Sequence, residues 1–147
     1  MRDAPLILVV EDDEHDVELT TRVLMRARVA NRIVAIHDGV EAAEWLLREG
    51  RHADRPDESV ALVLLDLGLP RLSGLELLDR LRADPRTSGL AIVVVTARSE
   101  AERRACLDRG ANAVLAKPLR LADLAEVSRT LKLGWILVDS TDRGAVP

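Results

Sequence analysis

Short apolar runs alternate along this chain with longer stretches in which apolar residues recur every three or four positions. The runs are rich in Val, Ile and Leu and are apolar on both alternating sets of positions, which is typical of strands of a parallel sheet buried on both faces. The predicted strands are residues 6–10, 32–37, 61–66, 90–96 and 113–116. The periodic stretches between them predict helices. Strict alternation of this kind predicts a three-layer α/β domain with right-handed crossovers.

Start and stop signals place the predicted helices. Their sequences are HDVELTTRVLMRARV (15–29), VEAAEWLLREG (40–50), LELLDRLRADP (75–85), SEAERRACLDRG (99–110) and LADLAEVSRTLKLG (121–134). Ser99 is expected to cap the fourth helix, and Gly50 and Gly110 to end theirs, because Ser favours helix starts and Gly favours helix ends. The polar segment 51–59 is expected to be a long surface loop.

The chain has 147 residues, which predicts one domain with a sizeable core. We place that domain at residues 1–134 and a tail at 135–147. Trp45 stands among aliphatic residues of a predicted helix and is expected in the core. The tail begins with apolar residues and leaves too little chain for a second output domain.

Composition and charge argue against several classes of function. The net charge of −4 and the absence of Phe and Tyr argue against nucleic-acid binding. One cysteine, Cys106, and three scattered histidines give no zinc motif. No apolar run approaches the roughly 18 residues that a membrane span requires, and the start lacks a signal-peptide pattern. We therefore expect a cytoplasmic protein that does not bind membranes.

Polar side chains follow four of the five predicted strands. They are Glu11, Asp12 and Asp13 after the first strand, Asp66 after the third, Thr96 after the fourth and Lys117–Pro118 after the fifth. The carboxyl ends of parallel strands meet at one edge of the sheet, which is where ligands bind in this class of fold. Carboxylates, a hydroxyl and an ammonium are therefore expected to converge there.

This set of groups favours phosphoryl chemistry. Hard oxygen ligands without histidine or thiolate suit Mg²⁺. An acidic magnesium site with a lysine and a hydroxyl can neutralise the equatorial oxygens of a phosphoryl group. Asp66 would be the nucleophile and would form an aspartyl phosphate.

Each residue alone also has a simpler interpretation. The acidic residues 11–13 could only cap a helix, Asp66 could belong to a turn, and Thr96 could cap a helix or fill a strand end. Lys117 could be a solvated lysine, and Pro118 could simply start a helix. The joint occurrence of all of them in one order favours the phosphoryl site.

Four segments carry a resemblance to a known family. They are VVEDD (9–13), LLDLGLPRLSGLELL (64–78), VVVTA (93–97) and GANAVLAKPL (110–119). With them, residues 5–133 resemble the receiver domain of bacterial response regulators. The resemblance implies a flavodoxin-like sheet of strand order 2-1-3-4-5. It also implies Mg²⁺-dependent phosphorylation by the phosphohistidine of a sensor histidine kinase.

The resemblance assigns roles to the acidic residues. Asp66 is the expected phosphoacceptor. Asp12 is expected to hold Mg²⁺ directly and Glu11 through water, and the Gly68 backbone carbonyl is expected to be a further metal ligand. Asp13 is expected to cap a helix.

The resemblance also implies how the switch is built. Thr96 would follow the phosphoryl group on activation, and Ala97 would leave room for it. Lys117 would pair with phosphoryl oxygens, and its peptide bond to Pro118 is expected to be cis. Many receivers carry Phe or Tyr where this chain has Val114, so the aromatic half of their switch is absent here. Gly68 is a second departure, because a larger polar residue often stands there.

The segment REGRHADRPDES (48–59) and the last helix followed by Trp135 are more specifically similar to single-domain regulators that accompany bacterial phytochromes. A phytochrome kinase is then the expected partner, and a histidine phosphotransfer protein is compatible as a recipient. Residues on the first helix are candidates for kinase contact or for a plain solvated face: His15, Glu18, Thr21 and Arg22.

The apolar tail favours a homodimer interface over the alternative in which the tail folds onto its own domain. The candidate interface residues are Leu133, Trp135, Ile136, Leu137 and Val138.

Two other functions compete with the regulator. A receiver that no longer accepts phosphate would serve as an interaction module, which Gly68 and Val114 leave open. A small phosphatase would need a second catalytic aspartate shortly after Asp66, where the sequence has Gly68. The regulator assists its own phosphorylation and dephosphorylation, and we do not expect an enzyme that turns over a metabolite.

Overall fold

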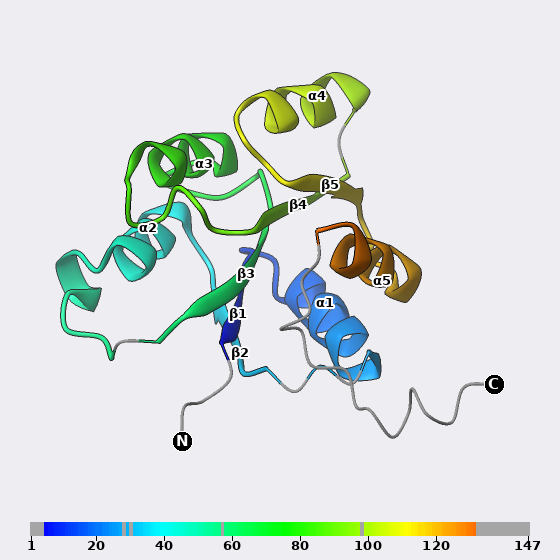
Figure 1. The fold of residues 1–147 in the computed structure, drawn as a ribbon, viewed down its shortest axis with the longest axis horizontal. Helices are drawn as coiled ribbons and strands as arrows, with labels where there is room; N and C mark the ends of the chain where they lie inside the picture. Colours follow the sequence, from blue (N-terminus) through cyan, green and yellow to red (C-terminus); the bar gives the residue numbers. More distant parts are fainter. Residues whose placement is uncertain (1–4, 28, 30, 57, 98, 132–147) are drawn as a thin grey trace.

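The computed structural model describes residues 5–27, 29, 31–56, 58–97 and 99–131 (Figure 1). Strands and helices alternate through the described residues, as the apolar pattern predicts. In order, the elements are β1 Leu6–Val10, α1 Glu14–Arg26, β2 Ile33–Ile36, α2 Gly39–Leu47, the 3₁₀ helix η1 Gly50–His52, β3 Val60–Leu65, α3 Gly74–Ala83, β4 Ile92–Thr96, α4 Glu100–Asp108, β5 Ala113–Ala116 and α5 Leu121–Thr130.

The five strands form one parallel sheet of order β2-β1-β3-β4-β5. This confirms the predicted strand order. Val10, the last residue of β1, is paired with Ile36 of β2 and with Leu65 of β3. Three strands therefore end at the same level, and the residues that follow them share one edge.

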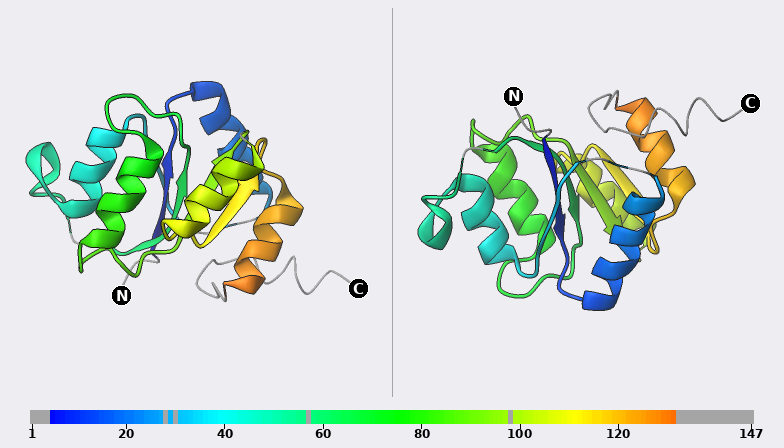
Figure 2. Two further views of the ribbon diagram at one scale, coloured as in Figure 1. Left: turned by 90° about the horizontal axis from the view of Figure 1, so that it is seen from above. Right: turned by 90° about the horizontal axis from the view of Figure 1, so that it is seen from below.

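Both faces of the sheet are covered, which explains why its strands are apolar throughout. Leu8 and Val10 of β1 lie in a core with α2, α3 and α4, whereas Ile7 and Val9 lie in a second core with α1 and α5. Figure 2 shows α2 and α3 on one side of the sheet and α1 and α5 on the other. A fully buried Leu such as Leu65 contributes about 1.5–3 kcal/mol through apolar burial.

Most predicted helix signals are confirmed, with one exception. The side chains of Asp13 and Ser99 accept the capping N–H bonds of α1 and α4. The prediction that Gly50 ends α2 is wrong: the left-handed residue that ends this helix is Arg48, with φ 56°. Gly50 instead begins η1, so part of the predicted loop 51–59 is a 3₁₀ turn.

Strand boundaries differ from the prediction at two positions that matter. β3 ends at Leu65, so Asp66 is the first residue beyond the strand. β4 begins at Ile92. Before it, the backbone N–H of Leu90 donates to the Thr87 carbonyl at 3.0 Å and closes a turn. The turn holds Leu90 out of the sheet.

Trp45 lies in the core as predicted and is 7% exposed. The Arg55 guanidinium lies over its ring, with Cζ 3.7 Å from the centroid, which is a cation–π contact. Within the described residues, no helix is long and apolar enough to cross a membrane. The candidate interface residues 133–138 and the tail lie outside the described part of the chain.

Candidate functional site

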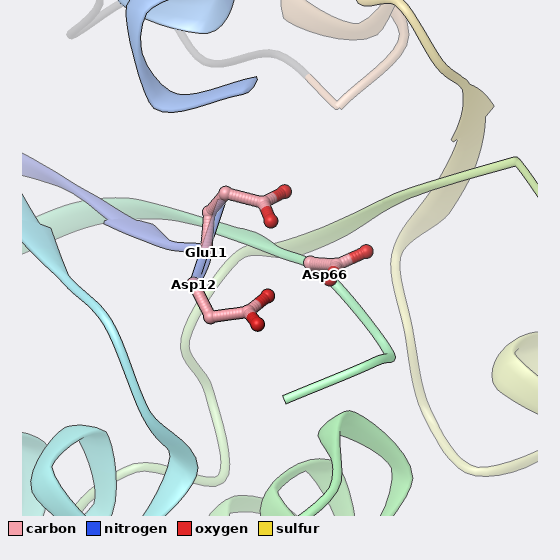
Figure 3. Close-up of side chains that lie close together, drawn as sticks. All are labelled: Glu11, Asp12 and Asp66. Carbon is pink, nitrogen blue, oxygen red and sulfur yellow. The ribbon is translucent and has the colours of Figure 1, made fainter. Parts of the chain in front are cut away.

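The acidic residues Glu11, Asp12 and Asp66 meet at the carboxyl edge of the sheet. Their backbones are fixed by the sheet, because the Glu11 N–H donates to the Ile36 carbonyl at 2.9 Å and the Asp66 N–H to the Val10 carbonyl at 3.0 Å. One carboxylate oxygen from each of the three lies within 4.8 Å of the others. In Figure 3 their carboxyl groups extend to the same side from the ends of β1 and β3.

The three carboxylates differ in exposure. Glu11 is buried, Asp66 is half-buried and Asp12 is exposed. Asp66 is therefore reachable from solvent while its backbone is still held by the strand. Three hard oxygen donors at this spacing fit a divalent cation that prefers oxygen ligands and keeps some of its waters. The predicted acidic site is thus assembled by the fold.

Lys117 follows β5 and reaches across this edge to the carboxylates. Its Nζ lies 2.8 Å from Glu11 Oε1, 3.1 Å from Asp66 Oδ1 and 3.0 Å from Asp16 Oδ2. Its backbone N–H donates to the Thr96 carbonyl at 3.0 Å, which ties the end of β5 to the end of β4. The peptide bond between Lys117 and Pro118 is cis, as predicted.

Asp16 is a site residue that the sequence analysis missed. It lies in the first turn of α1, where its N–H donates to the capping carboxylate of Asp13 at 3.1 Å. The cap sets the first turn of the helix beside the site and brings the Asp16 side chain to Lys117. A usable signal was present: Asp16 lies three residues after Asp13, the expected N-cap, and so belongs to the first turn of the helix that follows the acidic pair.

The charges at the site shift two pKa values. Burial raises the pKa of Glu11, and the hydrogen bonds from Lys117 and from the Asp13 N–H only partly offset this effect. Burial alone would lower the pKa of Lys117, but its hydrogen bonds to Glu11, Asp16 and Asp66 outweigh burial and raise the pKa. Lys117 is therefore a cation at neutral pH.

The residues expected to switch lie at the end of β4 and in β5. Thr96 ends β4 and is buried, and Ala97 follows it and is exposed. Val114 lies in β5, where it pairs with Val94 of β4 and is 5% exposed. The Arg103 guanidinium of α4 donates to the Val114 carbonyl at 2.6 Å and so links that helix to the strand.

The loop between β3 and α3 is fastened to the start of α2. Arg71 Nη2 lies 3.0 Å from both carboxylate oxygens of Asp38, the N-cap of α2. The Gly39 N–H donates to the Pro70 carbonyl at 3.3 Å. This loop contains Gly68, which is exposed beside the site. The role of the Gly68 carbonyl as a metal ligand stays a prediction.

The predicted kinase-contact residues lie on α1, next to the acidic site. His15, Glu18 and Arg22 are exposed, and Thr21 is half-buried. Arg22 forms an exposed ion pair with Glu18 at 3.4 Å. The face is therefore accessible, and its contact with a kinase stays a prediction.

Comparison with known sequences identifies relatives along almost the whole described chain. A family described as "Response regulator receiver domain" matches residues 7–129. Response regulator Rcp1 of Synechocystis sp. is 29% identical over 132 residues, which cover 89% of this chain and 88% of that protein. Response regulator MprA of Mycobacterium ulcerans is 43% identical over 126 residues, which cover 85% of this chain and 49% of that protein.

Solved structures show the same fold. The bacteriophytochrome response regulator AtBRR superposes with a TM-score of 0.84 at 32% identity, covering 93% of this chain and 99% of that chain. The Mn²⁺-bound form of Rcp1 superposes with a TM-score of 0.72 at 28% identity, covering 90% of this chain and 94% of that chain. Relatives of this chain thus include regulators associated with phytochromes and one that binds a divalent cation.

Proposed function

This chain belongs to the family of response regulator receiver domains, and we propose that it is a two-component response regulator in which Asp66 accepts a phosphoryl group from a sensor histidine kinase. Phosphorylation then favours one of two pre-existing conformations and changes which partner the regulator binds. We place this exchange in the cytoplasm.

One observation carries the proposal: the half-buried carboxylate of Asp66 lies next to both the ammonium group of Lys117 and the carboxylates of two further acidic residues. Lys117 Nζ lies 3.1 Å from Asp66 Oδ1, and Glu11 and Asp12 lie within reach of the same point. A purely structural ion pair would not need two further carboxylates within 4.8 Å. An incoming phosphoryl group does need them, because they recruit the metal that neutralises its oxygens.

In the proposed step, an oxygen of Asp66 forms a bond to phosphorus while the bond from phosphorus to the kinase histidine nitrogen breaks. The electron pair of that bond returns to the imidazole ring. Mg²⁺, held by Glu11, Asp12, Asp66 and the Gly68 carbonyl, would supply positive charge to the phosphoryl oxygens. Lys117 would donate a charge-assisted hydrogen bond to one of them.

The conformational response is proposed to begin at Thr96. Its hydroxyl would bond to a phosphoryl oxygen, and exposed Ala97 would leave space for that movement. Val114 cannot provide the rotating ring that many receivers use. We therefore propose that the response passes through α4, which Arg103 links to the Val114 carbonyl at 2.6 Å.

The proposed kinase is a bacterial phytochrome, because AtBRR and RtBRR are bacteriophytochrome response regulators. A histidine phosphotransfer protein is a second proposed recipient of the phosphoryl group. The test is transfer of ³²P from an autophosphorylated phytochrome kinase to this chain, with Asp66→Asn and a chelator as controls. We expect label on the wild type only. Absence of transfer to the wild type, from a kinase that labels its own regulator, would contradict this choice of kinase.

The alternative of an interaction module that takes no phosphate is supported by Gly68 and Val114, the two departures from the family pattern. Measurement of phosphoryl uptake from a small donor separates the two functions without any kinase.

We further propose that the regulator is a homodimer that uses the tail residues Leu133, Trp135, Ile136, Leu137 and Val138. The support is the apolar character of this sequence at the end of the family match. Sedimentation of the wild type and of Trp135→Ala tests it. A monomeric wild type at micromolar concentration would contradict the proposal.

A further inference from the structure

Lys117 has one carboxylate partner that is not part of the acidic cluster. Glu11 and Asp66 belong both to the cluster and to the contacts of Lys117, whereas Asp16 contacts only the lysine, at 3.0 Å. Asp16 also comes from a different element, because it projects from the first turn of α1. It therefore stands outside the set of residues expected to hold the cation.

The three contacts use the full donor capacity of the lysine. An ammonium group has three N–H donors and no acceptor, and three carboxylates lie within 3.1 Å of Nζ. A cation bound by Glu11 and Asp66 would compete with Lys117 for the same two carboxylates. The carboxylate of Asp16 is the one partner that Lys117 would not share with that cation.

We propose that Asp16 is a positioning residue that holds Lys117 beside the site while Glu11 and Asp66 bind the cation. The inference rests on the proposed function for the identity of the cation and the phosphoryl group. Without Asp16, the ammonium would lie on Glu11 and Asp66 alone and would compete with the cation for both.

The helix makes Asp16 suitable for this role. Its backbone is fixed by the Asp13 cap at 3.1 Å, and its side chain is 31% exposed, so solvent still reaches the carboxylate that holds the lysine. The side chain of Glu11 is only 7% exposed, and its negative charge needs a cation nearby. Asp16 thus retains the lysine, and Glu11 is released to the metal.

The test is Mg²⁺ affinity by isothermal titration calorimetry, which needs no phosphorylation. Asp16→Asn keeps the shape of the side chain and is expected to weaken Mg²⁺ binding about threefold to tenfold, the size of a pairwise coupling between contacting groups. Glu14→Gln is the matched control, because Glu14 is exposed in the same helical turn and loses the same charge. This control is expected to weaken binding less than about twofold, the size of a screened surface charge effect.

A double-mutant cycle shows whether Asp16 acts through the lysine. In a Lys117→Met background, Asp16→Asn should change Mg²⁺ affinity no more than Glu14→Gln does, because there is no ammonium left to hold. A purely structural role would instead lower the melting temperature in chelator while leaving Mg²⁺ affinity unchanged. Asp16→Ala serves as a second variant for the same cycle.

The outcomes separate this inference from the proposed function. Equal effects of Asp16→Asn and Glu14→Gln, or an Asp16→Asn effect that persists in Lys117→Met, would overturn the inference and leave the proposed function intact. A wild type that binds no Mg²⁺ would overturn both. The double-mutant cycle could show the expected coupling between Asp16 and Lys117 while Asp66 accepts no phosphoryl group. That result would support the role of Asp16 and contradict the proposed function.

Discussion

Gly74 lies directly against Asp66: a Cβ added to Gly74 would be 2.5 Å from the Asp66 carbonyl oxygen and 2.7 Å from Leu67 Cα. Gly74 is the first residue of α3, and its N–H donates to the Leu67 carbonyl at 3.0 Å. The helix therefore begins against the backbone that carries the candidate phosphoacceptor. Any side chain at this position must move that backbone.

Gly74→Ala is expected to lower the free energy of unfolding by about 1–3 kcal/mol, because the backbone of Asp66 and Leu67 leaves no room for the methyl group. It should also slow phosphorylation, since the shift falls on Asp66. Urea unfolding and phosphoryl uptake measure the two effects. Gly89→Ala is the control, because no atom lies within 4 Å of the Cβ it would add. Equal stability of the two variants would contradict the close packing.

Asp38 is expected to matter more for stability than its partner Arg71. Asp38 accepts the Glu41 N–H at 2.7 Å as the N-cap of α2 and also binds Arg71. Asp38→Ala removes the cap and the ion pair together and should cost about 1–2 kcal/mol. Arg71→Gln removes only the half-exposed ion pair and should cost less than about 1 kcal/mol. Urea unfolding of both variants checks the order, and a larger loss in Arg71→Gln would contradict it.

Asp84 gives the chain a pH-dependent contribution to stability. The Arg86 side chain and backbone N–H donate to its carboxylate, with both Arg86 N and Nη2 at 2.8 Å, and lower the pKa of Asp84 to about 2. A carboxyl group with a lowered folded pKa stabilises the fold above its unfolded pKa of about 3.9. This contribution is lost as the pH falls from there toward 2.

Asp84→Asn should therefore lower stability near neutral pH and converge with the wild type only as the pH falls below about 2, where the Asp84 carboxyl is protonated and both side chains are uncharged. Urea unfolding at several pH values measures the difference between them. An NMR titration of the Asp84 carboxyl carbon gives its pKa directly. A midpoint near the ordinary value would contradict the Arg86 contacts.

The elements and their order could be predicted because each depends on local sequence. Alternate residues of β1, such as Leu8 and Val9, pack into different cores, so a strand of this sheet must be apolar at every position. The location of the site could also be predicted, because the residues that follow parallel strands all lie at the carboxyl edge of the sheet. Glu11 and Asp66 therefore lie close together, as expected.

Long-range side-chain contacts could not be predicted in this way. Arg82 sits in a helical pattern as an ordinary charged residue, yet its guanidinium donates to the Gly110, Ser88 and Leu90 carbonyls and to Asn112 Oδ1 at 2.7–3.0 Å. Burial lowers the pKa of Arg82. Such a contact depends on where distant elements lie in three dimensions.

Two smaller errors have different causes. Arg48 rather than Gly50 takes the left-handed conformation at the end of α2, which propensity alone disfavours for a residue with a Cβ. Asp16 was placed in the predicted helix, but its contact was overlooked because its partner, Lys117, is 101 residues away in the sequence.

The most direct test of the central claim is the intact mass of the protein after incubation with acetyl phosphate and Mg²⁺. The account predicts one added phosphoryl group on the wild type, and none on Asp66→Asn or when a chelator is present. No adduct on the wild type, together with no binding of beryllofluoride as a phosphoryl mimic, would contradict a phosphorylated regulator and favour an interaction module instead.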